Sequence, residues 1–145
     1  MTFWRLVLVG LGLGYAGFGF AFLFSPSELA AFLSLTFSDP SARTDFRAMY
    51  GGLEIGLGGF MLACAARREF VRIGLFAAAC GTVGMATART VGMMLDGFAF
   101  NQLVSALVEW AIGFTSTWGA LVARPDLGML PAPVAGARDA ASSAR

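Results

Sequence analysis

Three charged side chains in this sequence lie inside long apolar stretches, where an ionised group is costly unless it faces water, protein or an opposite charge. They are Glu54, Arg89 and Glu109. An arginine presents a planar fork of donors that can bind one carboxylate through two hydrogen bonds and donate to a second. We therefore expect Arg89 to bind both glutamates. Such a cluster would either lock three helices together or form the bottom of an outward-opening pocket.

Other polar residues are spaced so that they can join these charges. Arg47, Tyr50 and Glu54 are separated by three, four and seven positions, so an α-helix would place them on one face. Counted by helical rise, Glu54, Arg89 and Glu109 all lie roughly 10 to 12 Å from the same membrane face. The predicted polar cluster consists of Arg47, Tyr50, Glu54, Arg89, Asp96 and Glu109. Further hydrogen bonds are expected from Tyr50, Thr82, Gln102 and Ser105.

The composition argues against several kinds of chemistry. All ten basic residues are arginine, and the sequence lacks histidine, the commonest ligand of zinc and haem. Cys64 and Cys80 lie in apolar stretches without a CxxC pattern, so we interpret them as packing residues. A formal net charge of +1 offers no strong field for nucleic acid. We therefore expect no catalytic residue, metal, cofactor or nucleic-acid partner.

The helices that must position the charges are predicted to cross a membrane. Of the 145 residues, 57% are hydrophobic and 13% are charged, against about 25% charged in a typical soluble domain. Residues 3–24, 44–66, 71–95 and 101–122 form four runs long enough to span the lipid bilayer. The predicted fold is all-α, an integral membrane four-helix bundle over residues 1–124. Residues 125–145, rich in Pro, Ala and Ser, are predicted to form a disordered cytoplasmic tail.

Two polar residues followed by proline predict helix starts between the first and second spans. Ser25 precedes Pro26 and Asp39 precedes Pro40, the order typical of an N-cap followed by the first helical position. Glu28 would complete a capping box with Ser25. The apolar run that follows is too short to span a bilayer. We therefore predict a short interfacial helix there.

The arginines predict the orientation of the chain in the membrane. Five of them lie at ends or loops on one side of the four predicted spans: Arg5, Arg67, Arg68, Arg72 and Arg124. Arg43 and Arg47 lie on the other side. The positive-inside rule then places both termini in the cytoplasm. The expected location is a bacterial inner membrane.

Glycines form a stripe on each of the first two predicted spans. The stripes are Gly10, Gly14 and Gly17 on the first span, and Gly52, Gly56 and Gly59 on the second. Small residues on facing helices allow two backbones to approach closely. We therefore predict that these two stripes pack against each other.

The sequence also resembles a known family, on motifs at the ends of the predicted spans. These are Arg47-x-x-Tyr50-Gly51-Gly52, then Arg89-x-x-Gly92-x-x-x-Asp96-Gly97, and finally Glu109 in the fourth span. Residues 3–124 are similar to bacterial four-helix membrane proteins grouped as domain of unknown function 4345 and related to the DoxX-like group. The resemblance implies the four-helix architecture and supplies no catalytic residues. Some DoxX relatives are linked to quinone-dependent thiosulfate oxidation.

Three functions are open at this point. The first is a small non-catalytic membrane protein that binds a lipid-like or small hydrophobic ligand, or a membrane partner, through the predicted polar cluster. The second is a membrane subunit of a quinone-linked oxidoreductase. The third is a proton-coupled small carrier that acts as a homo-oligomer, with Glu54 and Glu109 titrating. We favour the first, because the sequence has no redox motif and no inverted repeat.

Overall fold

The computed structural model describes residues 2–123, and within this range the chain is all-α, as predicted. The two helices α1 and α2 are followed by a continuous helical segment made of α3, the π-helical η1 and α4. A short 3₁₀ turn, η2, then leads into the long helices α5 and α6. The bounds are α1 (Thr2–Phe24), α2 (Pro26–Phe32), α3 (Pro40–Phe46), η1 (Arg47–Gly52), α4 (Leu53–Ala66), η2 (Arg68–Phe70), α5 (Val71–Asp96) and α6 (Phe100–Val122).

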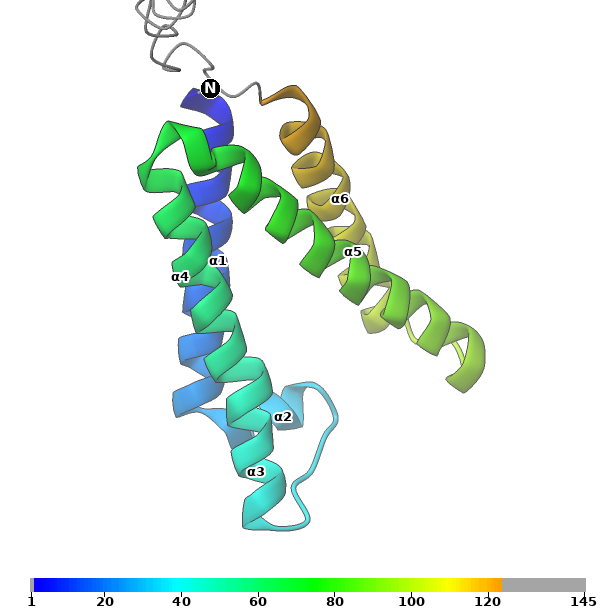
Figure 1. The fold of residues 1–145 in the computed structure, drawn as a ribbon. Coiled ribbons are helices and arrows are strands. Elements are labelled where there is room, and N and C mark those ends of the chain that lie inside the picture. Colours follow the sequence, from blue (N-terminus) through cyan, green and yellow to red (C-terminus); the bar gives the residue numbers. More distant parts are fainter. Residues whose placement is uncertain (1, 124–145) are drawn as a thin grey trace, which may run out of the picture.

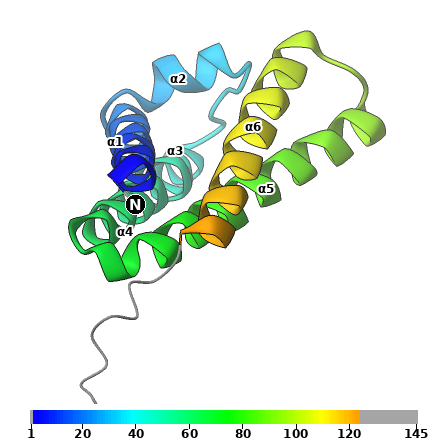
Figure 2. The ribbon, with the colours of Figure 1, turned by 90° about the horizontal axis from the view of Figure 1, so that it is seen from above.

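The long helices form two antiparallel pairs that meet at one end. Helix α1 packs along η1 and α4, and α5 packs along α6. Helix α5 joins the pairs, since it contacts both α1 and α4. From the shared end the pairs diverge (Figure 1), and the view from above shows α1 and α4 on one side with α5 and α6 on the other (Figure 2). The helices are therefore packed together as a bundle only near the shared end.

Three helical stretches are long and apolar enough to cross a membrane. They are Thr2–Phe24, Pro40–Ala66 and Arg68–Asp96. Helix α6 has the length, at 23 residues, but is not among the three, because Glu109 and several Ser, Thr, Trp and Gly residues lower its mean hydropathy. The fourth span and the interfacial position of α2 therefore remain predictions.

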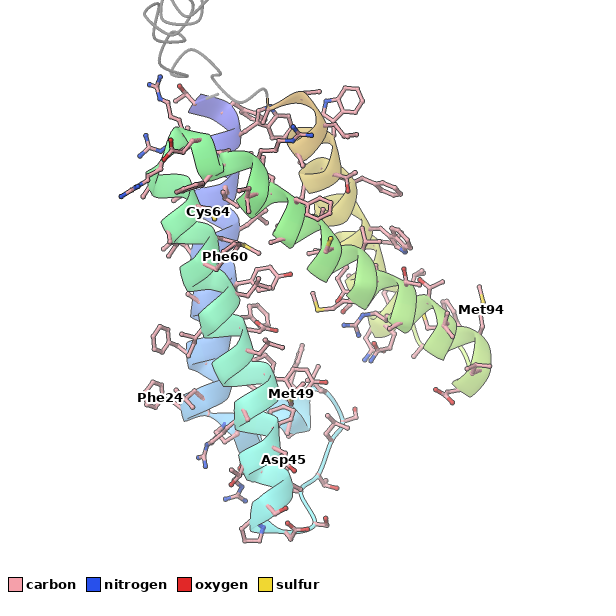
Figure 3. The ribbon with its side chains drawn as sticks, viewed as in Figure 1. Phe24, Asp45, Met49, Phe60, Cys64 and Met94 are labelled. Atoms are coloured by element: carbon pink, nitrogen blue, oxygen red, sulfur yellow. The ribbon has the colours of Figure 1, made fainter. Side chains whose placement is uncertain are left out.

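The apolar core lies where the two pairs meet. Leu8 of α1, Met61 of α4 and Leu75 of α5 are completely buried there. Cys64 belongs to the same cluster and lies near the shared end, far from Met94 at the opposite end of α5 (Figure 3). Cys80 is exposed on α5. Packing therefore explains the first cysteine, and the interpretation of Cys80 as a packing residue is wrong.

Helices α1 and α4 approach closely at glycines, but at different ones from those predicted. A Cβ added to Gly58 would lie 2.6 Å from the carbonyl oxygen of Gly12, and one added to Gly19 would lie 2.7 Å from that of Gly51. An added Cβ would meet nothing within 4 Å at any glycine of the predicted stripes: Gly10, Gly14, Gly17, Gly52, Gly56 and Gly59. The pairing of the helices is confirmed, and the predicted contact faces are wrong. Both helices carry glycine on two faces, so glycine spacing alone does not select the interface.

Two arginines bind helix ends in the α1–α4 pair, Arg5 at the end of α4 and Arg47 at the end of α1. Nε of Arg5 donates to the carbonyl oxygen of Ala65 at 2.7 Å, near the end of α4. Nε of Arg47 donates to the carbonyl oxygen of Leu23 at 3.0 Å, near the end of α1. The last carbonyls of a helix lack intrahelical donors and carry partial negative charge. The two arginines therefore stabilise both ends of the pair and favour one register.

The two predicted helix caps differ in the structure. The Asp39 carboxylate accepts hydrogen bonds from the backbone N–H groups of Ser41 and Ala42 at 2.7 and 3.0 Å, and these bonds lower the pKa of Asp39. Helix α2 begins at Pro26 as predicted, but the Ser25 side chain makes no capping hydrogen bond. The backbone N–H of Ser25 still bonds to Ala21 at the end of α1. Ser25 therefore continues α1 without capping α2.

Candidate functional site

A charged pair in the apolar part of the chain joins α5 to α6. Nη2 of Arg89 lies 2.7 Å from Oε1 of Glu109, and Nε lies 3.0 Å from Oε2. The remaining terminal nitrogen, Nη1, donates to the side-chain oxygen of Gln102. This is the two-bond fork geometry that makes arginine–carboxylate pairs strong and directional. We call these three residues the Arg89–Glu109 site.

The antiparallel packing of α5 and α6 explains why the three side chains meet. Gln102 and Glu109 are seven residues apart on α6, so they lie on one face two turns apart. A neighbouring contact holds the same part of the two helices together, since Nε1 of Trp110 donates to Oγ1 of Thr90 at 3.3 Å. The Arg89–Glu109 site is therefore part of a polar seam between the two helices.

The Arg89–Glu109 pair is only partly enclosed. The Arg89 side chain is 30% exposed and that of Glu109 is 14% exposed. The remaining surface of the ion pair is therefore open to a further polar partner.

Tyr15 of α1 is the member of this region that the sequence analysis missed. Its hydroxyl is buried without a hydrogen-bond partner among the described residues, whereas buried polar atoms nearly always have one. It lies 3.9 Å from the position of a Cβ added to Gly81 on α5. Tyr15 has no charged residue at helical spacing in the first span, so no pattern in the sequence connects it to the ion pair.

The other members of the predicted polar cluster lie elsewhere. Arg47 binds the end of α1, as described above. The ring of Tyr50 packs on Phe46, with centroids 4.7 Å apart. Asp96 is exposed at the end of α5. The structure therefore brings together only Arg89 and Glu109 of the six predicted residues.

Glu54 is partly buried and makes no hydrogen bond or ion pair with Arg89 or any other described residue. The expectation that Arg89 binds both glutamates is therefore wrong in this arrangement. Two features explain the difference. The helix pairs diverge beyond the shared end (Figure 1). The π-helical η1 also changes the angular spacing that an α-helix would give to Arg47, Tyr50 and Glu54.

Two of the expected hydrogen-bond donors are used locally. The Thr82 hydroxyl donates to the carbonyl oxygen of Ala78 at 2.8 Å, one turn earlier on α5. The Ser105 hydroxyl donates to the carbonyl oxygen of Asn101 at 3.2 Å on α6. Of the uncharged residues expected to supply hydrogen bonds, only Gln102 reaches the ion pair.

The region offers hydrogen bonding and electrostatic recognition. Its polar groups are a guanidinium, a carboxylate and an amide, from Arg89, Glu109 and Gln102. Within residues 2–123 there is no group of three or more Cys, Asp or Glu side chains arranged to hold a metal ion. An uncharged polar group suits the site, because Glu109 already balances the charge of Arg89.

Comparison with known proteins identifies a family. Residues 3–120 match the family model described as domain of unknown function (DUF4345). No curated protein and no solved structure matches the chain.

Proposed function

Because the chain belongs to the DUF4345 family, whose description names no activity, we propose a function from its geometry. The protein is a small, non-catalytic integral membrane protein. Its Arg89–Glu109 site binds the uncharged polar head of a lipid-like or other small hydrophobic ligand. The ligand head occupies the space between the ion pair and Tyr15.

The partly open ion pair is the observation that supports this proposal. An arginine within a membrane span is costly, and such residues tend to face a partner, water or a ligand. Arg89 uses all three of its nitrogens within the site, yet 30% of its side chain remains exposed. Nearer to the shared end, the buried Tyr15 hydroxyl lies against α5 at Gly81 and has no partner among the described residues. A polar ligand head between the two would satisfy this hydroxyl and cover the ion pair.

The proposed membrane arrangement has four spans. Helix α6 packs along α5 and runs antiparallel to it, so α6 returns across any membrane that α5 crosses. The start of α1, the α4–α5 connection and the end of α6 lie together at the shared end (Figure 1). Arg5, Arg67, Arg68 and Arg72 belong to that end. By the positive-inside rule it faces the cytoplasm, with both termini, and we place the protein in a bacterial inner membrane with α2 at the outer interface.

Native mass spectrometry of the detergent-purified protein tests the ligand. We expect a small hydrophobic molecule on the wild-type protein and its loss from Tyr15→Phe, which removes the hydroxyl and retains the ring. Tyr50→Phe is the matched control and should retain the molecule. A bound quinone would instead support the quinone-linked alternative. A wild-type protein free of any small molecule, or equal retention by both variants, would contradict the proposal.

Reporter fusions test the orientation. A reporter at Pro40 should be active outside the cytoplasm and one at Arg68 inside it. The reverse pattern would refute the proposed topology, and with it the outward position of α2.

A further inference from the structure

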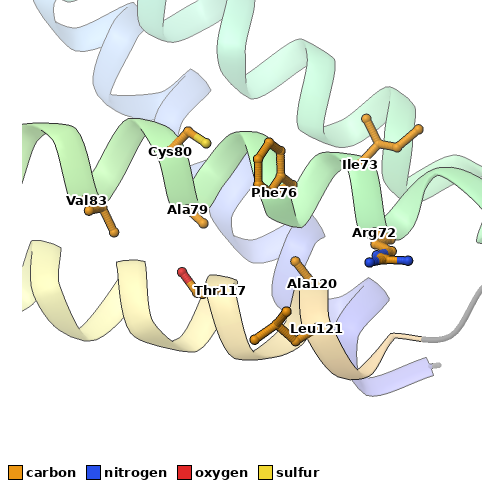
Figure 4. A pocket seen from close by; sticks show the side chains of 9 residues that line it. All are labelled: Arg72, Ile73, Phe76, Ala79, Cys80, Val83, Thr117, Ala120 and Leu121. Carbon is orange, nitrogen blue, oxygen red and sulfur yellow. The ribbon is translucent and has the colours of Figure 1, made fainter.

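An apolar groove lies between α5 and α6, nearer to the shared end than the Arg89–Glu109 site (Figure 4). Its volume is about 630 Å³, within the usual range of small-molecule sites. Phe76, Cys80 and Val83 line it from α5, and Thr117 and Leu121 line it from α6. The groove is therefore a separate feature of the α5–α6 pair.

The walls of the groove suit hydrocarbon. Phe76 is 64% exposed and Leu121 is 68% exposed, so both side chains present apolar surface to the surroundings. The α5 wall belongs to the candidate membrane span Arg68–Asp96. In a membrane, this surface meets lipid chains.

One end of the groove carries a positive charge. Arg72 lies in the first turn of α5 and lines one end of the groove (Figure 4). Within residues 2–123 it makes no ion pair, whereas Arg67 lies 3.9 Å from Glu69. Arg72 is also close to the start of the candidate span Arg68–Asp96, at the depth where lipid headgroups are found. A guanidinium there matches the geometry and charge of a phosphate.

We propose that this groove holds an acyl chain of an anionic phospholipid, whose phosphate binds Arg72. The apolar walls contact the chain, and the arginine at the membrane surface provides the preference for negative charge. This lipid site is independent of the ligand proposed for the Arg89–Glu109 site.

Charge recognition is tested by native mass spectrometry with added phosphatidylglycerol or phosphatidylcholine. The wild-type protein should retain phosphatidylglycerol preferentially. Arg72→Gln should reduce its retention about fivefold, the factor expected for one basic residue near an anionic lipid surface. Arg68→Gln removes the same charge outside the groove and should reduce retention less than Arg72→Gln does, because Arg68 does not line the groove. Equal losses in the two variants would overturn the proposal.

Occupancy of the groove is tested with two tryptophan variants. Cys80→Trp places a bulky ring in the groove and should reduce retention of both lipids. Met85→Trp is the control, because Met85 is exposed on α5 and does not line the groove. Circular dichroism should show both variants helical. Full lipid retention by Cys80→Trp would overturn the proposal, and so would a wild-type dimer that this variant abolishes, since a second copy would then occupy the groove.

Discussion

Replacing Glu109 with Gln should destabilise the protein, because it leaves the Arg89 guanidinium without its carboxylate in the apolar part of the chain. Removing one partner of a buried ion pair costs about 3 to 5 kcal/mol. The Arg89 side chain is 30% exposed, and Gln102 still accepts a hydrogen bond from it. We therefore expect the lower end of that range, about 3 kcal/mol, for Glu109→Gln and similarly for Arg89→Leu.

The double variant separates the ion pair from general damage. Arg89→Leu combined with Glu109→Gln leaves no unpaired charge at the site. The double variant should lower the free energy of unfolding by about 3 kcal/mol, whereas two independent losses would add to roughly 6 kcal/mol. By contrast, Glu54 makes no hydrogen bond or ion pair with Arg89. Arg89→Leu and Glu54→Gln should therefore add to within about 0.5 kcal/mol.

Reversible unfolding in mixed detergent micelles, followed by tryptophan fluorescence, measures these free energies. Trp110 is a suitable reporter, since its indole binds Thr90 beside the ion pair. A neutral Glu109→Gln would refute the reasoning about the pair. A coupling of Arg89 with Glu54 as large as that with Glu109 would show that the helix pairs close and all three charges meet.

The same assay tests the helix contacts. Gly58→Ala should lower the free energy of unfolding by about 1 to 3 kcal/mol, because its Cβ would meet backbone atoms of α1. Gly56→Ala should leave this free energy unchanged or raise it by up to about 1 kcal/mol. The reverse order would support the predicted glycine stripes as the contact faces. Arg47→Met removes the hydrogen bond to the end of α1 and should lower the free energy of unfolding by about 1.5 to 3 kcal/mol. The control is Arg43→Met at an exposed position, which should lower it by less than about 1 kcal/mol. Equal losses in the two variants would argue against a role for Arg47 at the helix end. The pKa of Asp39 is lowered by backbone donors, so its contribution to stability is complete at neutral pH and disappears as the pH falls through its folded-state pKa. The protection factors of the amides in the first turn of α3, which are corrected for the intrinsic pH dependence of exchange, should therefore fall on acidification in the wild-type protein and not in Asp39→Asn. Wild-type protection factors that do not change with pH would contradict this cap.

The helices themselves could be predicted from the sequence, because their causes are local. The helix predicted over residues 71–95 is observed as Val71–Asp96, and the helix predicted over residues 101–122 is observed as Phe100–Val122. Long apolar runs favour helix when the backbone must satisfy its own hydrogen bonds. The cap at Asp39 was predictable for the same reason, since it depends on the next three residues. The π-helix at Arg47–Gly52 left no recognised signal in the sequence.

The contact between Arg89 and Glu109 could also be predicted, because two opposite charges in consecutive apolar helices have few alternatives. What the sequence could not determine is the angle between the helix pairs. That angle follows from the burial of Leu8, Met61 and Leu75 where the pairs meet. It brings Tyr15 against α5 at Gly81 and leaves Glu54 without an ion pair. Charge and spacing are properties of single helices, whereas the distance between two helices depends on side chains packed far along the chain, and only the tertiary structure decides it.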